Sequence, residues 1–239
     1  MIATNDECYL PCWWGIQPGI TQWNGLRDVL GPLGWLQSLD VINDGRYEII
    51  ETVNQDNFPN LGLSFYSLGQ DTIQYVRIGA EMAYPPESQF YYEEFEKAWS
   101  RYSLAAILTE YGKPNKVSVY LQPGIIEQGG SWEYQIYLIY EDRGIFTRYT
   151  FENSISYDPS ADEYRVCPHN EDLTSVGLYL KPPADSTSFS EVMEYIGRSY
   201  LGDTKLLEDI SDLSVEEFHA LFAGQSVDNC LVSDGSNWP

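Results

Sequence analysis

Four cysteines have the most distinctive chemistry in this sequence of 239 residues. Cys8 and Cys12 lie close together near the start of the chain, whereas Cys167 and Cys230 lie far apart. Four cysteines allow three disulfide pairings. Proximity favours Cys8–Cys12, which leaves Cys167–Cys230 as the second pair. On the chain-entropy model the longer loop would stabilise the folded chain by about 4 kcal/mol and tie the C-terminal segment to the body of the protein.

Two alternatives to disulfides stay open. The thiols could be reduced and buried in a cytosolic protein, because disulfides are rare in the cytosol. A zinc site is disfavoured, because the sequence has only two histidines, His169 and His219, and Cys167-Pro168-His169 is not a recurrent metal spacing. His219 falls inside a predicted helix and His169 in a polar loop, so both are interpreted as structural or solvated residues.

The compartment follows from the cysteines rather than from a targeting segment. Residues 1–7 lack the basic and apolar regions of a signal peptide, and no stretch approaches the ~18 apolar residues of a membrane span. We expect an extracytoplasmic protein, secreted or lipid-anchored, whose leader or anchoring segment preceded Met1. Free-thiol titration tests this, because equal titres in native and in reduced, denatured protein would contradict the disulfides.

Acidic side chains offer a second kind of chemistry. Paired carboxylates hydrolyse glycosides, but among 36 acidic residues such pairs arise by number alone. The motifs of serine hydrolases, phosphate-binding loops and zinc proteases are absent from the sequence. We expect no catalytic, cofactor-binding or metal-binding residues. The acids around Cys167 could hold calcium but miss the spacing of a calcium loop: Asp158, Asp162, Glu163, Glu171 and Asp172.

The overall charge excludes some partners. The formal net charge is -23, from 36 acidic and 13 basic residues, so a basic face that neutralises nucleic-acid phosphates or anionic lipids is not expected. The hydrophobic fraction of 43% is that of a foldable chain, since disorder requires high charge together with low hydrophobicity.

Three segments share a helix pattern, at residues 21–30, 103–111 and 188–196. Each begins with a hydroxyl residue that can cap free N–H groups and is followed by a glycine that can turn left-handed. Residues 90–99 predict another helix. A closing helix is predicted from Ser214, which forms a capping box with Glu217, to Phe222.

Strand-like runs follow the first two helices. Their alternation and their β-branched and aromatic residues predict strands at residues 47–53, 61–66, 72–78, 116–121, 132–140, 145–151 and 176–180, with a tight turn at residues 141–144. The predicted fold is therefore α+β: tandem units of a short helix and an antiparallel meander, with a truncated helical third unit. Pro-rich linkers place the units at residues 1–84, 85–183 and 184–239.

The start of each unit resembles a known family. Residues 10–21, containing the run PCWWGI, lead to a short helix and Leu30-Gly31-Pro32, and residues 111–114 repeat part of this signature. The pattern resembles small lipoprotein domains of the SmpA/BamE type and the tandem plan of the β-lactamase-inhibitor protein. The PCWWGI opening is also similar to secreted or lipid-anchored proteins of filamentous environmental bacteria. The resemblance covers about 20 residues at each helix, not the sheets.

This sequence departs from the family pattern in two places. Residues 22–25, QWNG, replace the usual Lys/Glu-rich first turn, and the third copy lacks the proline. The resemblance implies a small α+β scaffold outside the cytoplasm that binds a protein or envelope partner without catalysis.

Aromatic residues are the predicted partner-binding groups, because Trp and Tyr dominate interface hot spots. Trp13 and Trp14 follow Cys12 and could anchor a partner, or could cap the core over a disulfide. Tyr134, Tyr137 and Tyr140 lie in one predicted strand, where they could dock a partner or sugar, or stabilise the sheet through cross-strand pairs.

The sequence favours a non-enzymatic extracytoplasmic protein that binds a protein or envelope component through an aromatic sheet face. The alternative is an acidic inhibitor or immunity-type protein that masks a basic enzyme or toxin, with association steered by charge. A carboxylate-based glycan-active enzyme is the third hypothesis.

Overall fold

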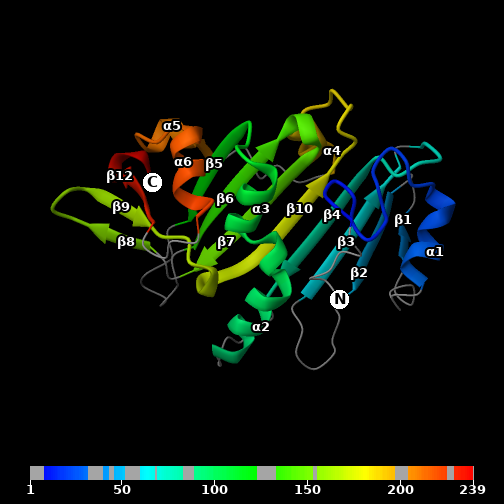
Figure 1. Cartoon of the computed structure of the whole chain (residues 1–239), viewed down its shortest axis with the longest axis horizontal. Coiled ribbons are helices and arrows are strands. Elements are labelled where there is room, and N and C mark those ends of the chain that lie inside the picture. Colours follow the sequence, from blue (N-terminus) through cyan, green and yellow to red (C-terminus); the bar gives the residue numbers. More distant parts are fainter. Residues whose placement is uncertain are drawn as a thin grey trace.

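The predicted mixture of helices and antiparallel strands is confirmed by a computed structural model of the chain (Figure 1). The structure describes residues 8–31, 40–42, 46–51, 60–67, 69–82, 89–122, 133–152, 155–196, 204–224 and 229–238. Several predicted features lie outside them: Gly197 at the end of the third helix, Pro32, residues 52–53 and 132 of two predicted strands, and residues 83–88 at the first unit boundary.

Nine strands of the described residues form one antiparallel sheet in the order β1-β2-β3-β4-β10-β7-β6-β5-β11. Every strand predicted from the sequence is present, with β4 shifted toward the C-terminus. The strands are β1 (Asp40–Ile42), β2 (Arg46–Glu51), β3 (Asn60–Tyr66), β4 (Tyr75–Glu81), β5 (Lys116–Gln122), β6 (Glu133–Tyr140), β7 (Ile145–Glu152), β10 (Leu173–Leu180) and β11 (Lys205–Leu206).

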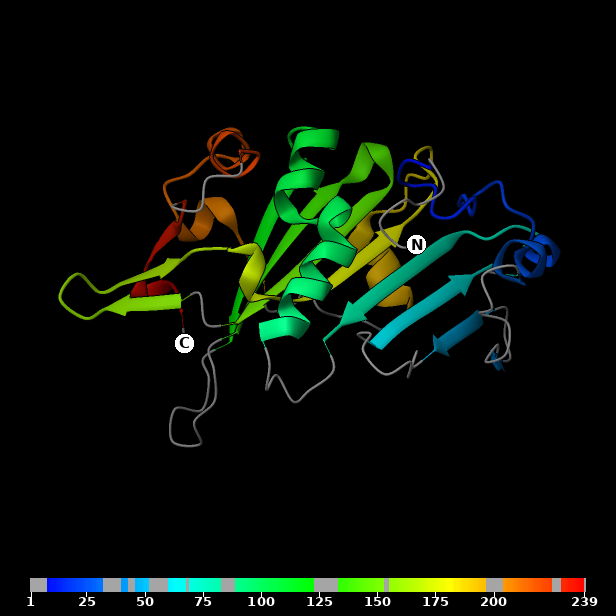
Figure 2. The same ribbon diagram turned by 60° about the horizontal axis from the view of Figure 1, so that its bottom comes forward.

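A smaller antiparallel sheet extends from one end of the molecule (Figures 1 and 2). Its order is β12-β9-β8, with β8 (Ile155–Asp158), β9 (Glu163–Val166) and β12 (Leu231–Asp234). The sequence did not predict these short strands. The hairpin of β8 and β9 lies in the connection between β7 and β10, and these two strands pair with each other in the large sheet.

The pairing of β4 with β10 joins the two halves of the large sheet. It runs in antiparallel register from Ser175 opposite Glu81 to Leu180 opposite Val76. One cluster of buried side chains extends from Leu10 to Leu231. The predicted segments 1–84 and 85–183 therefore contribute to one sheet and one core.

The helices pack on both faces of the large sheet. Helices α2 and α3 cover one face, and α4 lies on the other, as Figures 1 and 2 show. The helices are α1 (Leu26–Leu30), α2 (Gln89–Trp99), α3 (Leu104–Tyr111), α4 (Phe189–Tyr195), α5 (Leu207–Ile210) and α6 (Val215–Phe222). Short 3-10 turns are η2 (Trp23–Gly25), η5 (Ser100–Tyr102), η7 (Glu141–Arg143), η8 (Asn170–Asp172) and η9 (Gly235–Asn237). None of the described helices is long and apolar enough to cross a membrane.

The predicted caps hold for three helices. Ser103 Oγ accepts a hydrogen bond from the Ala106 N–H at the start of α3. Ser188 and Ser214 begin α4 and α6 with complete capping boxes. Gly112 ends α3 with φ of 70°.

The caps predicted for the first helix are wrong. Thr21 Oγ1 accepts a hydrogen bond from the Gln17 N–H, at 2.7 Å, instead of capping the helix. The chain enters α1 through a 3-10 turn, and Gly31 keeps right-handed helical geometry. The turn before the helix satisfies the hydroxyl locally, because Thr side chains readily bond to nearby backbone groups.

The capping glutamates give a pH prediction. Hydrogen bonds from Ser188 hold the pKa of Glu191 below its ordinary 4.5, and those from Ser214 do the same for Glu217. A lowered folded pKa contributes stability that is complete above the unfolded value and is lost as the pH falls through the folded value. Unfolding of the Glu191→Gln/Glu217→Gln variant in urea should therefore lose less stability between pH 6 and 3 than the parent protein.

Glutamine keeps the capping hydrogen bond but cannot titrate in this range, so the variant isolates the proton linkage. The same exchange at the exposed Glu93 is the control. If the free energy of unfolding falls equally with pH in the parent protein and in the double variant, the linkage is contradicted.

Candidate binding surfaces

Most of the aromatic side chains that were predicted to bind a partner are buried in the structure. Exposed fractions are 0% for Trp13 and Tyr134 and 1% for Tyr137 and Tyr140. Only Trp14 keeps part of its surface exposed, and it also packs against the core. Side chains inside the core are not accessible to a partner in this structure, so four of the five predicted residues serve packing.

On the face covered by α3, two of these tyrosines have clear structural roles. The Tyr134 ring stacks on Phe151 with centroids 5.1 Å apart. Tyr140 donates a hydrogen bond to the Gly112 carbonyl at 2.8 Å, which joins β6 to the end of α3. Burial raises the pKa of Tyr140, so its hydroxyl remains a donor.

Tyr137 points to the opposite face, where α4 covers it. Its ring lies 5.8 Å from Phe146, and Phe146 lies 5.6 Å from Phe189 of α4. From the sequence this face was expected to be accessible to a partner. The helix that covers it, α4, lies about 50 residues later in the chain, and nothing in the β6 segment indicates its presence.

A buried lysine holds α4 at this face. Lys181 Nζ lies 2.8 Å from Glu141 Oε2 and donates to the carbonyls of Asp185 and Thr187. The other Glu141 oxygen accepts the Phe189 N–H at 3.0 Å. The ammonium also lies 4.8 Å from the centre of the Phe189 ring. One ion pair therefore joins the turn after β6, the segment after β10 and the start of α4.

Gly144 makes this arrangement possible. It adopts φ of 67°, and a Cβ at this position would lie 2.2 Å from the Lys181 carbonyl oxygen. The predicted turn at residues 141–144 is confirmed, as η7 followed by the left-handed glycine.

Both predicted disulfides are present, as Cys8–Cys12 and Cys167–Cys230. The second lies beside the ladder of the small sheet, because Cys167 follows Val166 of β9, and Cys230 precedes Leu231 of β12, its partner. The covalent bond and the strand pairing therefore hold the same two segments together.

The small sheet carries a row of acidic side chains on its exposed face. Asp158 of β8 lies opposite Glu163 of β9, which lies opposite Asp234 of β12. All three are exposed, and the next row of the same face consists of Ser156, Arg165 and Val232.

Local hydrogen bonds keep two of these carboxylates ionised. Donation from Ser160 lowers the pKa of Asp158, and donation from Ser236 lowers that of Asp234. Each serine supplies both its hydroxyl and its backbone N–H. The negative charges of Asp158 and Asp234 therefore persist into mildly acidic solution.

The tip of the hairpin is ordered by aromatic and polar contacts. The rings of Tyr157 and Tyr164 lie 4.7 Å apart. The Tyr157 hydroxyl donates to Asp162 Oδ1 at 2.7 Å, and the Asp162 carbonyl accepts the Gly235 N–H. Tyr157 remains 46% exposed, on the face of the small sheet opposite to the acidic row, because successive side chains of a strand point to opposite faces.

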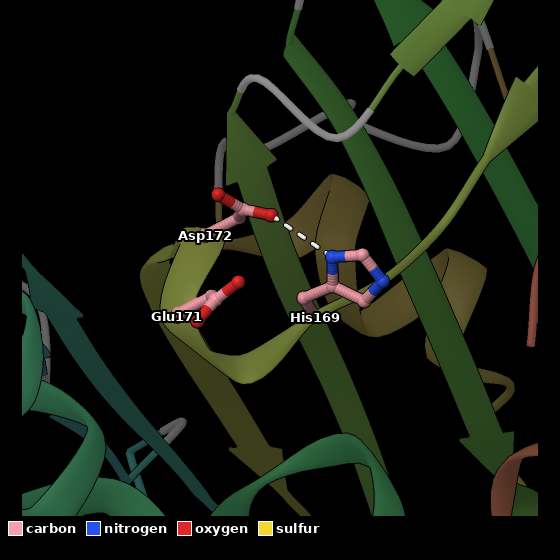
Figure 3. Close-up of side chains that lie close together, drawn as sticks. All are labelled: His169, Glu171 and Asp172. Atoms are coloured by element: carbon pink, nitrogen blue, oxygen red, sulfur yellow. Dashed lines mark ion pairs between the residues drawn. The ribbon is translucent and has the colours of Figure 1, made fainter. Parts of the chain in front are cut away.

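A second group of functional atoms lies at the η8 turn (Figure 3). The ligand-type atoms of His169, Glu171 and Asp172 all lie within 4.8 Å of one another. The acids of the β8–β9 hairpin that the sequence associated with Glu171 and Asp172 are not in this cluster, within the part of the chain that the structure describes.

The η8 turn borders a cavity of about 430 Å³. Its walls come from α2, the turn into α3, the η8 segment and the end of α6. Residues that line it include Glu96, Ser103, Leu104, His169, Glu171 and Phe222.

The other histidine is structural, as expected. His219 Nε2 lies 3.1 Å from the Leu108 carbonyl oxygen and joins α6 to α3. Thr109 makes a similar link, because its hydroxyl donates to the Ala223 carbonyl.

Comparison of the chain with protein-family models, with curated proteins and with solved structures gave no match in any of the three.

Proposed function

We propose that this is an extracytoplasmic, non-enzymatic protein that binds a basic surface of a protein partner through the sheet of β8, β9 and β12. Two disulfides support an oxidising location, because such bonds persist mainly outside the cytosol. The row of Asp158, Glu163 and Asp234 is the observation on which the proposed binding surface rests.

Like charges directly opposite each other destabilise a sheet. The three carboxylates of the acidic row repel one another across the strands, in a chain whose net charge is -23, although hydrogen bonds from Ser160 and Ser236 stabilise ionised Asp158 and Asp234. A partner that presents lysines or arginines would relieve this repulsion on binding. This favours the acidic-inhibitor hypothesis over the aromatic sheet face, whose residues are buried.

The shape and rigidity of the small sheet suit such a role. It extends from the body of the molecule, as Figure 2 shows. The Cys167–Cys230 bond holds one end, and the Asp162–Gly235 hydrogen bond holds the hairpin tip. A preorganised surface loses less conformational freedom on binding, which favours affinity.

The shifted carboxyl groups also support a binding role rather than general acid catalysis. A carboxyl group that donates a proton near neutral pH needs a raised pKa. The shifts resolved for carboxyl groups of the described residues are all downward, at Asp158, Asp185, Glu191, Glu216, Glu217 and Asp234.

The proposal includes a tandem organisation related to SmpA/BamE-type domains and the β-lactamase-inhibitor protein. It is supported by the chain order, in which a helix and strands β1 to β4 are followed by helices and strands β5, β6, β7 and β10. The two sets of four meet at β4 and β10. Helix α4 begins the third, shorter segment.

A charge-neutral variant tests the binding surface. Binding of a fluorescent lysine-rich peptide should weaken about tenfold in Asp158→Asn/Glu163→Gln/Asp234→Asn, and its association rate should fall steeply with salt. The same variant should have an equal or lower Tm, because hydrogen bonds from Ser160 and Ser236 stabilise the ionised carboxylates of Asp158 and Asp234 in the folded protein.

The matched control is Glu93→Gln/Glu194→Gln/Glu208→Gln, which removes the same charge at exposed positions outside the small sheet. An equal loss of binding in both triple variants would show that net charge alone determines peptide binding, and would contradict the proposed surface. A salt-independent association rate would also argue against it.

A further inference from the structure

The η8 turn brings together three side chains that are not part of the proposed partner surface. His169 Nδ1 lies 3.4 Å from Asp172 Oδ2, and Glu171 offers a carboxylate oxygen within 4.8 Å of both (Figure 3). We propose that these three residues bind a divalent transition-metal ion of the zinc(II) class. This inference is independent of the proposed partner binding.

The distances fit the coordination sphere of such an ion. Two ligand atoms held at 2.0–2.1 Å from a tetrahedral zinc lie about 3.3 Å apart. The separation of His169 Nδ1 and Asp172 Oδ2, 3.4 Å, matches this edge and is long for a hydrogen bond. Glu171 is exposed, so a rotation of its side chain completes the third position without moving the backbone.

The backbone holds the ligands in place before any ion binds. The His169 N–H donates to the Cys167 carbonyl at 2.8 Å, and the Asp172 N–H donates to the His169 carbonyl at 3.1 Å. Cys167 is itself fixed by its disulfide to Cys230. Because the turn is already closed, binding orders side chains alone, and less entropy is lost than when a site forms from a flexible loop.

The donor set selects the class of ion. An imidazole nitrogen favours zinc and other first-row transition ions, whereas calcium and magnesium prefer oxygen ligands alone. Two carboxylates neutralise the charge of a divalent ion when the imidazole is neutral. The sequence analysis expected no metal-binding residues, because the acids around Cys167 miss the spacing of a calcium loop and Cys167-Pro168-His169 is not a recurrent zinc spacing.

The cavity beside the turn gives the ion an open side. His169 and Glu171 line this cavity of about 430 Å³, together with Ser103 and Asn170. Three protein ligands leave a fourth zinc position for water or a small ligand. The site is thus of the open type rather than a closed structural centre.

Zinc chloride titrated into the intact protein tests the proposal, with a chromogenic chelator as competitor. One zinc per chain is expected, and affinity should fall by about tenfold or more in His169→Gln and in Glu171→Gln/Asp172→Asn. Calcium chloride should compete weakly. His219→Gln is the matched control, because it removes the other imidazole of the chain and should leave zinc affinity unchanged.

The variants also separate this site from the acidic row. Unchanged zinc affinity in Asp158→Asn/Glu163→Gln/Asp234→Asn is expected and would support the η8 site. No saturable binding, full affinity in a folded His169→Gln variant, or loss confined to the acidic-row variant would each overturn it. Circular dichroism of every variant confirms that the fold is retained.

Discussion

Replacing Lys181 by methionine is expected to lower the free energy of unfolding by about 3 kcal/mol. The change leaves the Glu141 carboxylate without its cation and removes the donor to the carbonyls of Asp185 and Thr187. The expected value is at the lower end for a broken buried pair, because the lysine side chain is 2% exposed but that of Glu141 is 31% exposed. Urea unfolding at neutral pH measures it.

Lys113 provides the matched control. It forms an ion pair with Glu216, but the two side chains are 49% and 65% exposed. Lys113→Met should therefore change stability by less than about 1 kcal/mol. Equal effects of Lys113→Met and Lys181→Met would show that burial of the Lys181 pair is energetically unimportant.

The Lys181 variant should also have a local signature. Glu141 accepts the Phe189 N–H, so loss of the ion pair loosens the start of α4 as well as the turn after β6. Hydrogen exchange should accelerate first in α4, while β6 and β7 stay protected. Uniform acceleration across the large sheet would instead indicate global destabilisation.

Removal of the Cys167–Cys230 disulfide is the second change with a large expected effect. The bond closes a loop with a sequence separation of 63, and its loss in Cys167→Ser/Cys230→Ser should cost about 4 kcal/mol. The loss should appear first in the small sheet, whose β9 and β12 flank the bond. Urea unfolding under oxidising conditions gives the magnitude.

The shorter disulfide provides a comparison for this result. Cys8–Cys12 spans a separation of 4, so Cys8→Ser/Cys12→Ser should cost only about 2 kcal/mol on the same entropy model. A larger loss from the short loop than from the long one would show that native contacts around Cys8, rather than loop closure, determine the stabilisation.

Much of the fold follows from local pattern. The long strands alternate or contain β-branched residues, and the caps at Ser103, Ser188 and Ser214 satisfy free N–H groups within one turn of the chain. The strands that sequence reasoning missed have two to four residues and form only where a partner lies beside them. Such strands are too short to show a recognisable alternation of apolar and polar residues.

Burial of the tyrosines was not predictable in the same way. A strand pattern gives two faces but does not say what covers each one. In β10 every residue from Leu173 to Leu180 is buried, because helices lie on both sides of the sheet. The start of α4 contacts the Lys181–Glu141 pair, whose members are 40 residues apart in sequence.

The two candidate sites differ in what the sequence reveals. His169, Glu171 and Asp172 are neighbours in the chain, so their proximity was open to prediction from one turn. The acidic row depends on Asp234, which joins Glu163 only through the pairing of β12 with β9. Long-range pairing of this kind has no local sequence signal.

The pairing of β4 with β10 also sets a delay during synthesis. Some 90 residues separate the two strands, which at about 5–20 residues per second takes roughly 5–18 s to translate. Until β10 is made, β4 is an open edge on which any other unpaired strand competes. The time between the two strands, rather than the stability of either half, therefore determines how long the nascent chain is exposed to mispairing.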